Sequence, residues 1–277
     1  MTKQIKDIDF DLLKSFLKPR VVNSNKGDFG HSLLIGGNHG FVGAIMMASM
    51  AALRVGSGLT TVATRPDNAL SIVTHQPELM AAGIHNIADL EILLRKATVI
   101  GIGPGLGQDN WAEILLAKVV KQNKLLVVDA DALNLLAKTP QQCEHWVLTP
   151  HPGEAARLLN VDIQAIVEQR EQAVQQLQEK YGGVAILKGH HTLLATTNEI
   201  YRCTAGNPGM ASGGMGDILT GVITGLLAQK IPVDAAAKIA VYIHAKAADL
   251  AAKLGGERGM LATDLLPYLR VLVNPES

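Results

Sequence analysis

Short, continuously apolar runs constrain the fold of this chain more than any other feature of its sequence. The runs are rich in Leu, Val and Ile, and strands that are apolar on both faces are typical of a parallel sheet covered by helices. They begin at His31, Leu59, Ala97, Lys124, His145 and Gly183. Segments with helical period lie between them, at 43–56, 110–121, 152–159 and 162–181. This order predicts an α/β fold with a doubly wound sheet.

The pattern changes after residue 190. The stretch "HTLLATTNEIYRCTA" predicts two strands joined by a turn at Thr197 and Asn198, an antiparallel hairpin at the edge of a mostly parallel sheet. From Asp217 onward the chain is mostly helical, with one long amphipathic helix at "VDAAAKIAVYIHAKAADLAAKL". No repeat or linker divides the 277 residues, so we expect one domain over residues 1–277.

Composition favours a small-molecule enzyme over a nucleic-acid or membrane protein. The 25 Lys and Arg residues balance 25 Asp and Glu residues without forming a basic block. No apolar run reaches the roughly 18 residues of a membrane span, and the start lacks the apolar core of a signal peptide. Cys143 and Cys203 lie outside any C-x-x-C motif. Together these features predict a cytoplasmic location and no membrane or nucleic-acid partner.

The unusual residues of this chain follow the predicted strands. In an open parallel sheet, ligands bind beyond the carboxyl ends of the strands. The loops at those ends are "GGNHGFVGA" (36–44), "GIGPGLG" (101–107), "DADALN" (129–134), "TPHPGEA" (149–155) and "KGHHT" (188–192). We expect these five loops to share one cleft.

The glycine-rich stretch "NPGMASGGMGDILTGVITGLLAQ" (207–229) predicts a helix after Asp217, because apolar residues then recur with helical spacing. The amides of its first turn would form an anion hole. That hole would consist of Gly213, Gly214, Met215 and Gly216. Asp217 beside it is suited to accept a hydroxyl proton during phosphoryl transfer. A glycine-rich turn with Asp217 as a helix N-cap explains the same residues equally well.

Other motifs leave alternatives open. "GIGPGLG" does not match the dinucleotide fingerprint G-x-G-x-x-G, and no P-loop is present. Asp129 and Asp131 could hold Mg²⁺ through water or cap the helix at residue 132, and we favour the cap. A helix start explains Pro152 and Glu154 but leaves His151 unexplained.

The adjacent histidines His190 and His191 also permit two interpretations. On a strand their side chains would point to opposite faces, which disfavours a shared metal ion. A polar hairpin entry is the simpler interpretation.

Eight segments, taken together and in order from about residue 25 to residue 270, resemble the ADP- or ATP-dependent NAD(P)H-hydrate dehydratases of the ribokinase-like superfamily. The segments are "KGDFGHSLLIGG", "AALRVGSGLTTVAT", "PELM", "GIGPGLG", "VVDADALNLLA", "LTPHPGEAARLL", "LKGHHT" and "GNPGMASGGMGDILTGVITGLLAQ". The resemblance implies a three-layer α/β/α sandwich. It also implies a lyase that restores NADH or NADPH from the S-epimer of the hydrate, through a phosphorylated intermediate.

The same resemblance implies roles for individual residues. Asp217 would be the catalytic base. The hydrate would bind near Ala44, Gly107, His151 and Asp217. The adenine nucleotide would bind along Lys188, Gly189, His190, His191 and Thr192, and at Gly216. Mg²⁺ would screen the nucleotide phosphates, with no metal ligand assigned.

The resemblance further implies partners and assembly. We expect ADP as the phosphoryl donor, a homotetramer, and an NAD(P)H-hydrate epimerase as a separate chain. The main alternative is a kinase for a vitamin-precursor alcohol, of the hydroxyethylthiazole or hydroxymethylpyrimidine type, which would release a stable phosphorylated alcohol. A nucleotide sensor without turnover is a third hypothesis, and it would keep its function when Asp217 is replaced by Asn.

Overall fold

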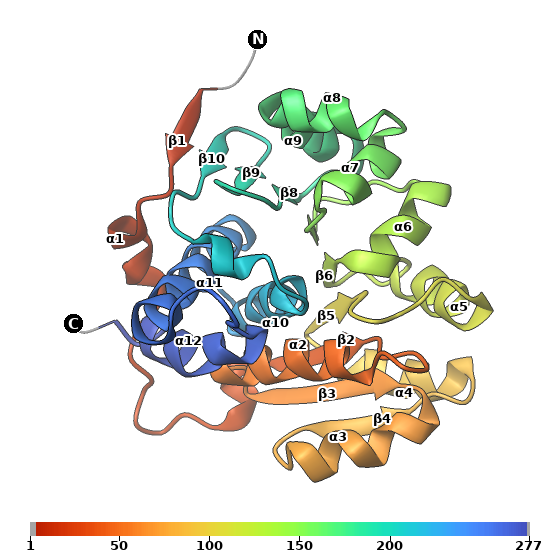
Figure 1. Cartoon of the computed structure of the whole chain (residues 1–277). Helices are drawn as coiled ribbons and strands as arrows, with labels where there is room; N and C mark the ends of the chain where they lie inside the picture. Colours follow the sequence, from red (N-terminus) through yellow and green to blue (C-terminus); the bar gives the residue numbers. More distant parts are fainter. Residues whose placement is uncertain (1–3, 276–277) are drawn as a thin grey trace.

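The computed structural model describes residues 4–275 of the chain (Figure 1). Its strands form one sheet in the order β1-β10-β9-β8-β7-β6-β5-β2-β3-β4. Their bounds are β1 (Ile5–Asp7), β2 (His31–Ile35), β3 (Leu59–Thr64), β4 (Met80–Gly83), β5 (Val99–Ile102), β6 (Leu125–Val128), β7 (Trp146–Leu148), β8 (Val184–Leu187), β9 (Leu193–Ala195) and β10 (Ile200–Arg202). Strand β9 is antiparallel to both neighbours, and the other described pairs are parallel. The predicted mostly parallel sheet is confirmed.

Helices cover both faces of this sheet. The α-helices are α1 (Phe10–Leu13), α2 (Val42–Arg54), α3 (Ala69–His75), α4 (Ile87–Lys96), α5 (Asn110–Val119), α6 (Ala130–Lys138), α7 (Pro152–Leu159), α8 (Ile163–Glu168), α9 (Arg170–Tyr181), α10 (Met215–Ala228), α11 (Val233–Gly255) and α12 (Leu266–Leu272). In Figure 1, α10, α11 and α12 lie together on one face, and α5, α6 and α7 lie on the other. The layers are therefore α/β/α.

The strands are buried on both faces, as their apolar runs predict. Val127 of β6 packs into the core beneath α10 and α11, whereas its neighbours Leu126 and Val128 pack against α5 and α6. The alternation follows from the pleat, which turns successive side chains to opposite faces. Burial on both faces accounts for the predominance of apolar residues in these strands, although β2 and β3 also bury Ser32, Thr60, Thr61 and Thr64.

The predicted helix over 162–181 is wrong in one respect, because it consists of two helices. Gln169 adopts φ −125° and ψ 50°, which separates α8 from α9. Helix α8 packs against α7, and α9 packs against β8 and β9. The break lets each helix follow a different surface. Neither Gly nor Pro marks it in the sequence.

The predicted hairpin is present as β9 and β10, but it does not form the edge of the sheet. Strand β1 pairs in parallel with β10, from Ile5 opposite Ile200 to Asp7 opposite Arg202. Just beyond the strand, the amide of Ile8 donates to the carbonyl of Arg202 at 2.9 Å. The edge prediction was wrong because this pairing joins segments nearly 200 residues apart, which leaves no local pattern.

Helix α10 begins at Met215, earlier than predicted. Its N-cap is Gly214, whose φ of 92° suits a residue without a Cβ. Asp217 therefore lies inside the first turn and is not the N-cap, so that alternative is wrong. The first-turn amides that lack an intrahelical partner are those of residues 214–217, one residue later than the anion hole predicted at 213–216.

The strand order reverses between β2 and β5, because the chain adds β3 and β4 on one side of β2 and places β5 on the other. The two loops that follow β2 and β5 touch each other. Gly37 N donates to Pro104 O at 3.0 Å, and Asn38 N donates to Gly105 O at 2.6 Å. Such a reversal opens a crevice at the carboxyl ends of the strands.

Among residues 4–275, none of the helices combines the length and the apolar character that a membrane span needs.

Candidate active site

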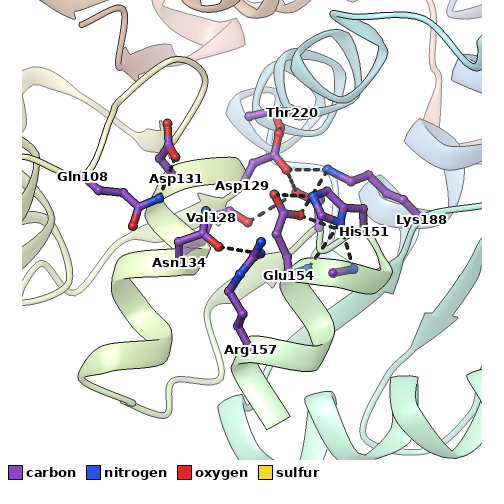
Figure 2. A network of polar contacts seen from close by, with 12 residues as sticks. Gln108, Val128, Asp129, Asp131, Asn134, His151, Glu154, Arg157, Lys188 and Thr220 are labelled. Carbon is purple, nitrogen blue, oxygen red and sulfur yellow. Dashed lines mark hydrogen bonds and ion pairs between the residues drawn. The ribbon is translucent and has the colours of Figure 1, made fainter. Parts of the chain in front are cut away.

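The carboxylate of Asp129, directly after β6, joins the ends of three strands to α10 (Figure 2). It is 1% exposed and accepts hydrogen bonds from Lys188 Nζ at 2.7 Å, Thr149 Oγ1 at 2.8 Å and Thr220 Oγ1 at 2.7 Å. The residue occupies the N-cap position of α6, yet its side chain makes no cap hydrogen bond. The predicted cap was therefore wrong, because the ammonium and two hydroxyls are the partners of this buried charge.

Asp131 also differs from the predicted cap. Its carboxylate accepts from Gly107 N at 2.9 Å and from Gln108 Nε2 at 3.2 Å, across the crevice (Figure 2). The side chain thus holds the loop after β5 against the start of α6. Gly107, with φ 73°, is the predicted hydrate-binding residue of that loop.

Lys188 follows β8 and points toward the acidic residues of the crevice. Its Nζ lies 2.7 Å from Asp129 Oδ1 and 3.9 Å from Glu154 Oε2. Burial alone would lower the pKa of Lys188, but the charges of Asp129, Glu154 and Asp217 raise it overall. A Cβ on Gly216 would lie 3.2 Å from Lys188 Nζ. The charged ammonium therefore lies beside the first turn of α10.

Asp217 shares this environment. Burial raises its pKa, and so does the negative charge of Asp129; Lys188 opposes them, and the resulting pKa is about 7. The charges of Asp131 and Glu154 act in the same direction as Asp129. A carboxylate with a pKa near neutrality can accept a proton and release it again, as a general base must.

His151 caps α7, which explains the residue that a helix start had left unexplained. Its Nδ1 accepts from Gly153 N at 3.0 Å and Glu154 N at 3.3 Å. The proton therefore resides on Nε2, which lies 3.3 Å from Glu154 Oε1. Burial and the charges of Lys188 and Arg157 lower the pKa of His151, and burial raises that of Glu154.

The predicted nucleotide-binding segment is a tight turn between β8 and β9. Gly189 adopts φ 142°, and Thr192 Oγ1 donates to its carbonyl at 3.1 Å. The rings of His190 and His191 stack at 3.9 Å, so they do not point to opposite faces of a strand and that premise was wrong. Arg170 of α9 donates a hydrogen bond to the carbonyl of His190 and so fixes the turn against α9.

The remaining predicted residues lie around the same crevice. Ala44 is in the first turn of α2, and its Cβ lies 3.2 Å from where a Cβ on Gly105 would be, against the loop after β5. The Met215 side chain is buried in the core, so only its amide is available. Gly213 faces open space, whereas Gly214 packs closely on Met47.

Prediction from sequence missed three residues of this site. Thr149 and Thr220 hold the Asp129 carboxylate, and Glu154 contributes a buried charge near Lys188. Glu154 had a visible signal, since it follows His151 in "TPHPGEA" at the spacing of a capping box. The threonines had none, because their partner comes from a distant strand.

Two further features delimit the site. In residues 4–275, no group of three His, Cys, Asp or Glu residues is placed to hold a metal ion. A cavity of about 1480 Å³ lies elsewhere, between residues 16–29 and α12, and none of the predicted site residues lines it. The candidate site consists of charged side chains and backbone amides at the carboxyl ends of the strands.

A family model described as NAD(P)H-hydrate dehydratase matches residues 32–270 of the chain. The chain belongs to this family. It is 54% identical over 260 residues to the bifunctional NAD(P)H-hydrate repair enzyme Nnr of Coxiella burnetii, covering 94% of this chain and 53% of that protein. It thus spans about half the length of that relative. It is 39% identical to the ADP-dependent (S)-NAD(P)H-hydrate dehydratase of Streptococcus thermophilus, covering 87% of this chain and 90% of that protein.

Solved structures agree with this family and confirm the ribokinase-like fold. A ribokinase-like superfamily protein of Enterococcus faecalis has a TM-score of 0.90 at 34% identity, with 98% of this chain and 95% of that chain covered. The ADP/ATP-dependent NAD(P)H-hydrate dehydratase of Bacillus subtilis, co-crystallised with ATP and Mg²⁺, has a TM-score of 0.88 at 27% identity, with 97% and 98% covered. The hydroxyethylthiazole kinase of Pyrococcus horikoshii, at 13% identity and a TM-score of 0.66, shares the fold alone.

Proposed function

We propose that this chain is an ADP-dependent dehydratase of the S-epimer of NAD(P)H hydrate, working as one domain over residues 1–277. The observation that carries the proposal is Asp217, whose pKa of about 7 is combined with a position in the first turn of α10. Unpaired amides of that turn and the ammonium of Lys188 meet beside it. A base, a cationic side chain and an anion-binding helix terminus are what phosphoryl transfer to a hydroxyl requires.

The chemistry follows from the poor leaving ability of hydroxide. The hydroxyl oxygen of the hydrate attacks the terminal phosphorus of ADP, its proton passes to Asp217, and AMP leaves. The lone pair of the ring nitrogen then expels phosphate, and loss of a proton from the neighbouring ring carbon restores the double bond. The amides of residues 214–217 and Lys188 stabilise the negative charge that develops on the phosphoryl oxygens.

The predicted ligand positions fit this division of labour. We propose that the hydrate binds near Ala44, Gly107, His151 and Asp217, and that the nucleotide binds along residues 188–192 and at Gly216. Two features support a phosphate at that point. The amide of Gly216 lacks an intrahelical partner, and a Cβ on Gly216 would lie only 3.2 Å from Lys188 Nζ. The side chain of Met215 is buried, so the anion hole in this chain relies on backbone amides.

Mg²⁺ fits the site as a companion of the nucleotide. When bound, it neutralises phosphate charge during transfer. Since residues 4–275 contain no cluster of three ligating side chains, the phosphates and water would supply most of its ligands. We further propose a cytoplasmic homotetramer whose substrate, the S-epimer, is supplied by an NAD(P)H-hydrate epimerase.

The test is turnover by purified protein, with Mg²⁺, NADPH hydrate and either ADP or ATP. We expect the absorbance of the reduced nicotinamide to rise with ADP, together with release of free phosphate. Asp217→Asn should lower this rate about 100- to 10,000-fold, since the general base is lost, while ADP still binds. No rise with either nucleotide would overturn the proposal. A stable phosphorylated alcohol from a vitamin precursor would then establish the kinase alternative.

A further inference from the structure

We propose that Asp129 is a positioning residue. Its carboxylate holds the ammonium of Lys188 at the donor phosphate and, through Thr220, also fixes the position of α10. The inference rests on the proposed function and extends it to a residue outside the predicted hydrate and nucleotide sites. It begins from the three hydrogen bonds that this buried side chain accepts.

The first step is the geometry of the ammonium. Lys188 Nζ has three N–H donors, and Asp129 Oδ1 at 2.7 Å accepts one of them. Glu154 Oε2 lies at 3.9 Å, within ion-pair distance but beyond a hydrogen bond. At least one donor thus remains for a phosphate at Gly216 without breaking the bond to Asp129. The lysine can bind an anion while it stays anchored.

The second step is the connection to the base. Asp129 Oδ2 accepts from Thr220 Oγ1 at 2.7 Å, and Thr220 follows Asp217 by one helical turn on α10. A Cβ on Gly216 would lie 3.7 Å from the same oxygen. One carboxylate therefore contacts the lysine through one oxygen and the helix of the base through the other. Lys188 and Asp217 are positioned relative to each other through Asp129.

The third step is electrostatic. The charged groups that act on the pKa of Asp217 are Asp129 after β6, Asp131 on α6, Glu154 on α7 and Lys188 after β8. His244 of α11, whose pKa is lowered to about 4 mainly by burial, is neutral. Among the carboxylates, Asp129 raises the pKa of Asp217 most. Removing its charge should lower that pKa, since a like charge no longer opposes ionisation.

The experiment compares Asp129→Asn with Thr149→Val in the full chain. Asp129→Asn keeps the size of the side chain and removes its charge. We expect kcat to fall at least about tenfold, because a neutral acceptor holds an ammonium less firmly, while the Kd for ADP measured by calorimetry stays within a few-fold. The acid limb of the pH profile of kcat/KM should move down by about one pH unit.

Thr149→Val is the matched control, since it removes one hydrogen bond to the same carboxylate and keeps the charge. Its acid limb should remain at the wild-type pH. An acid limb that moves equally in both variants, or kcat within twofold of wild type in Asp129→Asn, would overturn the positioning role. A raised Mg²⁺ requirement with an unmoved acid limb would also overturn it and make Asp129 a metal ligand.

A second variant covers the case in which Asp129→Asn does not fold. Thr220→Val breaks the bond between α10 and Asp129 Oδ2 and leaves the charge in place. We expect a lower kcat with an unmoved acid limb, and wild-type kcat would overturn the inference. Turnover by the wild-type chain separates the two proposals. If it is present and the variants are unaffected, only the positioning role fails, and if it is absent both fail.

Discussion

Asp217 imposes an energetic cost on the folded chain. Its pKa is about 7 in the fold against 3.8 for the free group, so the fold disfavours the ionised form. Between these two pH values the unfolded chain has released the proton and the folded chain retains it. Stability attributable to this group therefore falls as pH rises from about 4 to about 7. The environment that raises the pKa of Asp217 toward neutrality therefore lowers the free energy of unfolding.

Asp217→Asn should therefore stabilise the protein while it slows turnover. At about 1.4 kcal/mol per pH unit of pKa shift, the gain at pH 8 is at most about 4 kcal/mol. Thermal unfolding of both proteins at pH 4, 6 and 8 measures the effect. The difference in Tm should grow with pH and vanish near pH 4. A Tm gain that does not depend on pH would show that the ionised carboxylate is not its source.

Single residues also show where sequence stops being informative. The position of Asp217 beside the start of a helix could be predicted, because a glycine-rich run followed by apolar residues at helical spacing marks that start in the sequence. The hydrogen-bond partners of Asp129 could not be predicted, since Lys188 and Thr220 come from distant segments. A local pattern offered only the helix cap. The missing information was tertiary.

Among the elements, α7 is capped by His151, which is also a predicted hydrate-binding residue. His151 satisfies two amides of α7 through Nδ1 and lies at the crevice. A cap that is not replaced costs about 1 kcal/mol. A side chain that caps a helix can still present its other ring nitrogen to a ligand.

His151→Ala and His151→Asn separate the two tasks. Both variants should raise KM for the hydrate, because both remove the imidazole. Only His151→Ala should lower Tm, since Asn is a good N-cap. Thermal unfolding and steady-state kinetics of the pair measure this. Wild-type KM in His151→Asn would restrict the histidine to its structural task.

The elements that were predicted share strong local patterns. Strands β2, β3 and β5 to β8 are runs rich in apolar and β-branched residues, and α7 starts at a proline and a capping box. Strands β1 and β4 were not predicted, because they are short edge strands without such runs. The break at Gln169 was invisible because it serves packing against two different surfaces.

At the scale of the whole molecule, β1 brings the start of the chain against β10. Exposed ion pairs Lys6–Glu199 and Asp7–Arg202 flank the backbone ladder. Exposed pairs of this kind contribute little, so the backbone pairing is the important part. An unpaired β10 would be a free edge open to other chains.

Deletion of residues 1–8 should therefore lower Tm and promote aggregation at high protein concentration. Lys6→Ala combined with Asp7→Ala is the matched control, because it removes both ion pairs and keeps the ladder. Its Tm should change little. Light scattering and thermal unfolding of the three proteins measure the difference. An equal loss of Tm in the double variant would show that the ion pairs, and not the backbone pairing, provide the stabilisation.

Strand β9, the antiparallel member of the sheet, has a consequence for how this protein can change. Because β9 turns straight back beside β8, the predicted nucleotide segment at 188–192 is a turn, with no crossover helix after it. The loops predicted to hold the hydrate lead into helices that are part of the core. A turn can be replaced without disturbing a layer of the sandwich. If the nucleotide binds at this turn as proposed, a few substitutions there could change the preference for ADP or ATP. The residues predicted to bind the hydrate are less free to change, because their loops lead into core helices.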